Sequence, residues 1–149
     1  MINKNKLKEL VNALDALSDD VKDWDVAMGS IDKPLCGTPG CHAGLISIVA
    51  KDLPELQDIY NDDYRIYDNR YEYDIWADAL TVFLGFAKGR GLEDWAECNP
   101  EIWGNENGFV MFSSRSAFTN DPDKQLNHRD IINHWKQVLK NIENEGVGI

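Results

Sequence analysis

Apolar residues recur three or four positions apart in several long stretches of this chain, and this spacing constrains its fold more than any other feature. Residues spaced in this way share one face of an α-helix, and that face has to be buried against other helices. Four stretches are long enough for a main helix: about residues 4–17, 39–51, 75–87 and 128–142. The sequence therefore predicts a mainly α protein.

Capping residues predict where several helices begin. Asp74 is predicted to cap the helix that begins at Ile75, and Asn127 is predicted to cap the last helix. The charge of Asp130 favours the first turn of that last helix. Shorter helical pieces are predicted at about residues 54–60, 93–97 and 100–103.

Aromatic and charged residues alternate on both sides of Asp68-Asn69, over residues 64–73. Alternation with a period of two is typical of strands, and a polar pair at its centre fits a turn. We expect either one minor β-hairpin here or an irregular loop packed by its tyrosines. The complete fold prediction is one compact domain over residues 1–149, with four main helices, short helical turns and a flexible tail at 145–149.

The run Cys36–Gly44 holds two cysteines, a histidine and three glycines within nine residues. Thr38-Pro39 is a helix-start signal, and Gly40 and Gly44 are spaced to lie on one helix face, where another backbone could approach closely. On this interpretation the two cysteines pack beneath the helix start as small apolar side chains. The segment then defines the fold and performs no chemistry.

The alternative interpretation is a metal or thiol site on Cys36, Cys41 and His42. A structural zinc takes four ligands, and the remaining ones would have to come from distant residues such as Cys98, His128 or His134. A helix start lowers the pKa of a thiol, but the neighbouring His42 would point to a different side of the helix from Cys41. We favour a non-catalytic protein without metal or cofactor, and the metal- or thiol-dependent protein stays open.

The net charge of −11 is concentrated in residues 51–80, which hold nine acidic and three basic residues. This acidity argues against direct binding of nucleic acid or of an anionic membrane and permits a protein partner with a basic surface. Tyrosines among the acids would supply rigid contact area. The alternative is a solvated acidic face whose tyrosines cover the core. The predicted partner-binding residues are Asp62, Asp63, Tyr64, Tyr67, Asp68, Tyr71, Glu72 and Tyr73.

The three cysteines follow no secretory signal, and no apolar run approaches the length of a membrane span. These features predict a cytoplasmic protein with reduced thiols. The sequence does not define an oligomeric state.

The pattern Trp24-Asp25-Val26, then Cys36-Gly37-Thr38, Cys41 and Ala43-Gly44 resembles one found in small phage and prophage proteins without an assigned activity. Those proteins carry Phe-Asp-Met, a short spacer and C-G-T-x-x-C-x-x-G at the start of a helix. The likeness covers about residues 7–52, and this chain departs from it at Trp24, Val26 and His42. The resemblance implies a phage-type protein in the cytoplasm of an infected or lysogenic bacterial host. With the acidity, it favours an inhibitor of a host nucleic-acid-handling or defence protein.

Overall fold

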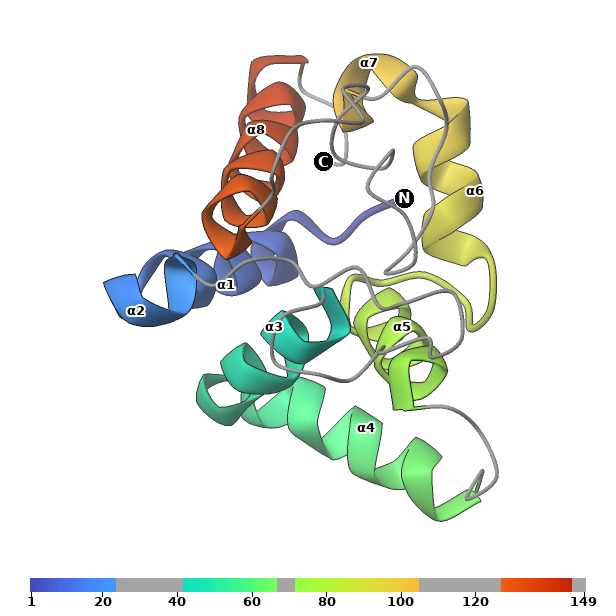
Figure 1. The fold of residues 1–149 in the computed structure, drawn as a ribbon. Helices are drawn as coiled ribbons and strands as arrows, with labels where there is room; N and C mark the ends of the chain where they lie inside the picture. Colours follow the sequence, from blue (N-terminus) through green and yellow to red (C-terminus); the bar gives the residue numbers. More distant parts are fainter. Residues whose placement is uncertain (24–41, 67–71, 105–126, 146–149) are drawn as a thin grey trace, which may run out of the picture.

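The computed structural model describes residues 1–23, 42–66, 72–104 and 127–145, and no β-strand occurs among them. Figure 1 shows the helices that they form: α1 (Lys4–Asp15), α2 (Asp19–Lys22), α3 (His42–Val49), the 3-10 helix η1 (Ala50–Asp52), α4 (Pro54–Ile66), α5 (Glu72–Phe83), α6 (Gly91–Cys98), α7 (Pro100–Trp103) and α8 (His128–Glu145). The mainly α prediction is confirmed. Six of these helices have eight residues or more, where the sequence predicted four main helices.

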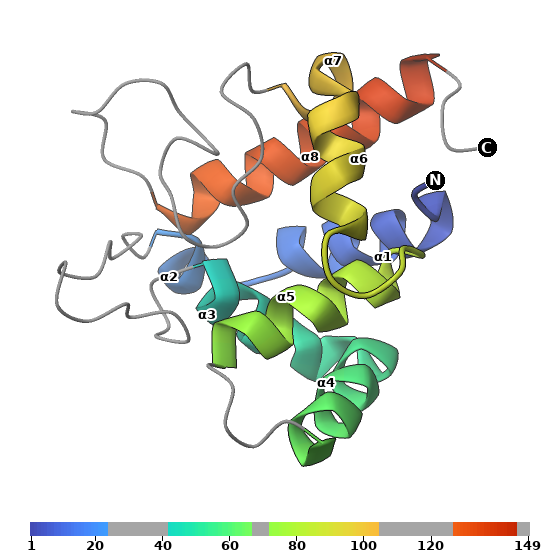
Figure 2. The ribbon, with the colours of Figure 1, turned by 90° about the vertical axis from the view of Figure 1, so that its right-hand side faces the viewer.

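The helices pack in two groups that share one core. In the first group α5 packs against α3 and α4, and in the second α8 packs against α1, α2 and α7. Helix α3 joins the groups, because it contacts both α1 and α8. Figure 2 shows α8 and α4 on opposite sides of a layer that holds α1, α3 and α5. The two ends of the described sequence, α1 and α8, therefore lie side by side.

Large apolar side chains from both groups fill the core. Trp76 of α5 and Trp135 of α8 are buried, as their positions on apolar stripes predicted. Trp103 of α7 is also buried, and its ring meets that of Trp135 edge-on at a centroid distance of 5.4 Å. Edge-to-face aromatic pairs add stabilisation beyond the apolar area that they bury. This pair fastens α7 to α8.

The start of α8 confirms the capping prediction. The Asn127 side-chain oxygen Oδ1 accepts a hydrogen bond from the Asp130 backbone amide at 3.2 Å. In return, Asp130 Oδ2 accepts one from the Asn127 amide at 2.9 Å. This reciprocal pair satisfies two backbone donors at the helix start. The predicted start of α7 is confirmed as well, since Pro100 is its first residue.

The prediction for residues 64–73 is wrong in its hairpin form. Helix α4 continues through Ile66, beyond its predicted end at Tyr60, and α5 already begins at Glu72. Leu56, Tyr60 and Asp63 are buried at spacings of four and three, so the helical period continues past Tyr60 to the residue before the alternation begins. Asp74 lies inside α5 and does not cap it. The turn pair Asp68-Asn69 falls outside the described residues, as does the predicted tail from 146 onward.

The end of α5 also differs from its predicted position at Ala87. The helix ends at Phe83, and Gly85 follows it with a positive φ of 97°. The Phe86 amide donates to the Thr81 carbonyl at 3.1 Å and the Gly85 amide to the Val82 carbonyl at 3.0 Å. These two bonds form the Schellman arrangement in which glycine commonly closes a helix. Gly85 is thus the stop signal that the apolar pattern concealed.

The first helix stops at Asp15, two residues before its predicted end at Leu17. Ser18 starts α2, because its hydroxyl oxygen accepts a hydrogen bond from the Val21 amide at 3.4 Å. This short second helix was missed by the sequence analysis. The helix predicted over 39–51 is described from His42 onward and passes into η1, which ends at Asp52.

Candidate functional site

The Cys36–Gly44 segment lies largely outside the described residues, which include its His42 backbone and Gly44. Helix α3, which the segment enters, packs against α5, α1 and α8. Gly44, Leu45 and Ile46 are buried in the first turns of this helix. The helical end of the segment therefore belongs to the core, and the cysteines Cys36 and Cys41 fall outside the part that the structure describes.

Cys98, His128 and His134, which the sequence offered as further metal ligands, each have a different environment in the structure. Within the described ranges, no group of three or more His, Cys, Asp or Glu side chains is arranged to hold a metal ion. Cys98 is exposed on α6. His128 is buried, and its Nδ1 lies 2.9 Å from the Val21 carbonyl oxygen, so this nitrogen carries the proton and donates it.

His134, in the middle of α8, packs against an aromatic residue of α7. Its ring meets that of Trp103 edge-on, with 4.3 Å between the ring centroids. Burial lowers the pKa of His134 to about 4, because the charged imidazolium is poorly solvated there. His134 is therefore neutral at physiological pH, and it acts as a packing residue.

Asp63 was predicted to contact a partner, and the structure places it away from the surface. Its side chain is 5% exposed, and its Oδ1 forms an ion pair with the ammonium group of Lys88. A carboxylate that is buried and paired within the molecule offers little charge to a partner. We therefore leave Asp63 out of the proposed partner surface.

The other predicted partner residues are described to different extents. Asp62 is exposed on α4. The backbones of Tyr64, Glu72 and Tyr73 lie in α4 and α5, whereas Tyr67, Asp68 and Tyr71 are outside the described residues. The neighbouring Tyr60 is buried and stacks on Trp76 at a centroid distance of 3.8 Å, as expected for a tyrosine that covers the core.

Helix α4 carries an acidic outer face that the sequence analysis did not define, because the helix was predicted to stop at Tyr60. Glu55, Asp58 and Asp62 are exposed at spacings of three and four. This spacing places them on one side of the helix. The opposite side, with Leu56 and Tyr60, packs toward the core and α5. The acidic face is therefore directed to solvent.

A groove of about 550 Å³ lies beside this acidic face. It is lined by α1, by the turn from η1 into α4, and by the last residue of α5. Its residues are Lys6, Glu9, Asn12, Ala13, Asp52, Leu53, Pro54, Glu55 and Phe83. The volume falls within the range of pockets that bind small molecules or side chains. Sequence reasoning missed it, because its walls come from segments about 40 and 70 residues apart.

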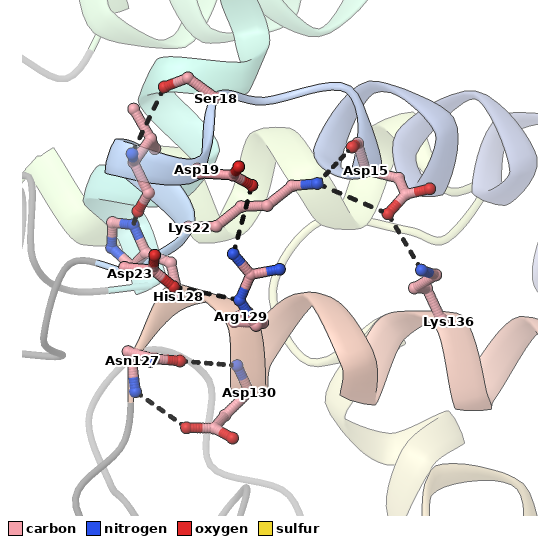
Figure 3. A network of polar contacts seen from close by, with 11 residues as sticks. Asp15, Ser18, Asp19, Lys22, Asp23, Asn127, His128, Arg129, Asp130 and Lys136 are labelled. Atoms are coloured by element: carbon pink, nitrogen blue, oxygen red, sulfur yellow. Dashed lines mark hydrogen bonds and ion pairs between the residues drawn. The ribbon is translucent and has the colours of Figure 1, made fainter.

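A network of polar contacts fastens α2 and the end of α1 to α8 (Figure 3). Arg129 of α8 forms ion pairs with Asp19 at 3.4 Å and with Asp23 at 3.1 Å. Lys136 pairs with Asp15 of α1 at 2.9 Å, and this pairing lowers the pKa of the Asp15 carboxyl group. The network consists of exposed pairs between helices, and each such pair contributes little to stability.

None of the helices in the part of the chain that the structure describes has both the length and the apolar character that a membrane crossing needs. Comparison with models of known families, with curated protein sequences and with solved structures finds no match to this chain.

Proposed function

We propose that this chain is a non-catalytic, acidic protein of phage type that acts by binding a protein with a basic surface. The observation that carries the proposal is the exposed acidic face of α4, formed by Glu55, Asp58 and Asp62. It lies in the segment where nine acidic residues stand against three basic ones. An acidic face of this kind steers a basic partner and opposes binding to phosphate groups.

The partner class follows from the same charge argument. Basic protein surfaces commonly serve to bind the phosphates of nucleic acids. An acidic protein that covers such a surface competes with the nucleic acid for it. We therefore propose that the partner is a nucleic-acid-handling or defence protein of a bacterial host, whose activity this chain inhibits. The resemblance of residues 7–52 to phage proteins supports a bacterial host as the source of the partner.

The test is capture of partners from the bacterial host at low salt, followed by calorimetry with the purified partner. We expect a basic protein whose affinity falls as salt rises, because salt screens exposed charges. Neutralising the acidic segment should weaken binding about tenfold or more. The variant for this step combines Asp58→Asn, Asp62→Asn, Asp68→Asn and Glu72→Gln.

A matched control removes the same number of charges from α6, α7 and α8, with Asp94→Asn, Glu97→Gln, Glu101→Gln and Glu143→Gln. All four control residues are exposed. We expect the control to retain most of the affinity. Equal losses in the two variants would show that only net charge matters, and undiminished binding by the first variant would exclude the acidic segment as the partner surface.

A further inference from the structure

The groove beside α4 combines an apolar inner side with an acidic edge. Phe83 and Leu53 line it and are themselves buried, with 3% and 8% of their surfaces exposed. Glu9, Asp52 and Glu55 line it from exposed positions. A site of this composition suits a side chain with an apolar stem and a positively charged head, as in arginine and lysine.

Lys6 already places such a head in the groove. Its ammonium nitrogen Nζ lies 5.5 Å from the centroid of the Phe83 ring, where an aromatic face attracts cations. It is also 3.4 Å from Glu9 Oε2 and is hydrogen-bonded to Glu55. The hydrogen bond to Glu55 is the main cause of the raised pKa of Lys6. The chain thus supplies a cation to its own groove.

This internal cation leaves acidic charge uncompensated. Three carboxylates line the groove against the one ammonium group of Lys6. Within the described residues, Asp52 forms no ion pair. The groove therefore keeps the capacity to bind a second positive charge, or to exchange Lys6 for one from outside.

We propose that the groove is the docking site for a basic segment of the partner protein, and that an arginine or lysine of this segment displaces Lys6 from between Glu9 and Glu55. The proposal rests on the proposed function and locates its contact. Charge complementarity favours this occupant, and so does continuity, because Glu55 belongs both to the groove and to the acidic face of α4. A segment seated in the groove would extend along Asp58 and Asp62.

The test uses the full ¹⁵N-labelled chain and the probe peptide acetyl-Leu-Arg-Leu-amide. Its counterpart with citrulline, which has the same shape without the charge, serves as the uncharged control. We expect the arginine peptide to shift the amide signals of the groove residues, and the citrulline peptide to shift them far less. Lys6→Met removes the internal competitor and keeps the apolar stem, so it should tighten peptide binding about fivefold.

Lys8→Met is the matched control for Lys6→Met, because it removes the same charge from the same helix. Lys8 lies outside the groove, and its ammonium group is 3.9 Å from Glu143. We expect its effect on peptide affinity to be small. Equal tightening by both variants would overturn the proposal, as would equal binding of the citrulline peptide or signal shifts confined to residues outside the groove.

Two results distinguish a failure of the groove as docking site from a failure of the proposed function. Peptide binding in the groove, with no basic partner captured from the host, would remove the proposed function and leave a cation-binding groove. A captured basic partner whose affinity is unchanged by the double variant Glu9→Gln, Glu55→Gln would keep the proposed function and overturn the groove as its docking site.

Discussion

At the scale of single residues, His134 gives the molecule a specific response to pH. Its pKa in the folded protein is about 4, below the ordinary value of 6.5, because burial against Trp103 disfavours the charged ring. Between these two pH values the unfolded chain holds the proton and the folded chain does not. The contribution of the neutral His134 ring to the free energy of unfolding is therefore fully present above pH 6.5, and the free energy of unfolding falls as the pH drops toward 4.

We predict that His134 accounts for about 3 kcal/mol of this loss, from the size of the pKa difference. The measurement is chemical denaturation of the wild type and of His134→Gln from pH 4 to pH 7.5. Carboxyl groups titrate in both proteins, so their contribution cancels in the difference. The variant should lose less stability than the wild type below pH 6.5, and parallel curves for the two proteins would contradict the prediction.

Burial was predicted correctly for some residues and wrongly for others. Trp76 and Trp135 were placed in the core correctly, because each lies on a helical apolar stripe. Asp63 was assigned to the surface because it is acidic, but it is buried against Lys88, 25 positions further along the chain. Local spacing carries no information about a partner that only tertiary packing brings near. The groove around Lys6 and Phe83 was missed for the same reason.

At the scale of elements, two helix starts were predicted correctly from their own residues, whereas the start of α5 and the Ser18 cap of α2 were not. Asn127 and Pro100 mark their helices with side-chain chemistry that acts within a few residues. Helix α4 runs past its predicted end at Tyr60, since its continuation carries a buried aspartate, Asp63, and then enters the alternating aromatic segment. Gly85 stops α5 through its backbone conformation, which the apolar residues around it did not reveal.

The cap of α8 supplies a prediction at this scale. Asn127→Ala removes the acceptor of the Asp130 amide hydrogen bond and should lower the free energy of unfolding by about 1 kcal/mol. Urea denaturation at pH 7 measures the change. The control is Asn133→Ala, an exposed position in the same helix, which should change stability by less than about 0.5 kcal/mol. A loss in the control equal to that in Asn127→Ala would show that the cap is not the cause.

At the scale of the whole molecule, the first residues of the chain are fastened to the end of α5. Ile2 is 1% exposed, and the Asn3 amide donates a hydrogen bond to the Leu84 carbonyl at 2.7 Å. Gly85, next to Leu84, has no side chain to obstruct this contact. A Cβ atom at Gly85 would lie 3.2 Å from the Cβ of Asn3, which also caps α1.

We predict that Gly85→Ala destabilises the protein more than Gly89→Ala. Both glycines have a positive φ, so alanine costs about 1–2 kcal/mol of backbone strain at each. Only at Gly85 does the new methyl group also press on Asn3, because no atom lies within 4 Å of the position at Gly89. Thermal and urea denaturation of the two variants give the comparison. Equal stability losses would mean that the Asn3 segment moves aside without cost.

The mainly α class of the molecule followed from the sequence, but the arrangement of its helices did not. Periodicity reports which face of a helix is buried and not which helix covers it. The pairing of α1 with α8 connects the two ends of the described sequence. One contact in this pairing joins Asp15 to Lys136, and these two residues are 121 positions apart. The local sequence around either residue does not predict the other as its partner.

That pairing has a consequence for how the protein is made. A ribosome releases α1 first and α8 last of the described helices, so α1 lacks its α8 contacts while the residues between the two helices are synthesised. During this interval the side of α1 that packs against α8 remains exposed to other chains and to chaperones. The contacts between α1, α2 and α8 therefore form among the last, and a nascent chain that stops before α8 leaves uncovered the side of α1 that packs against α8.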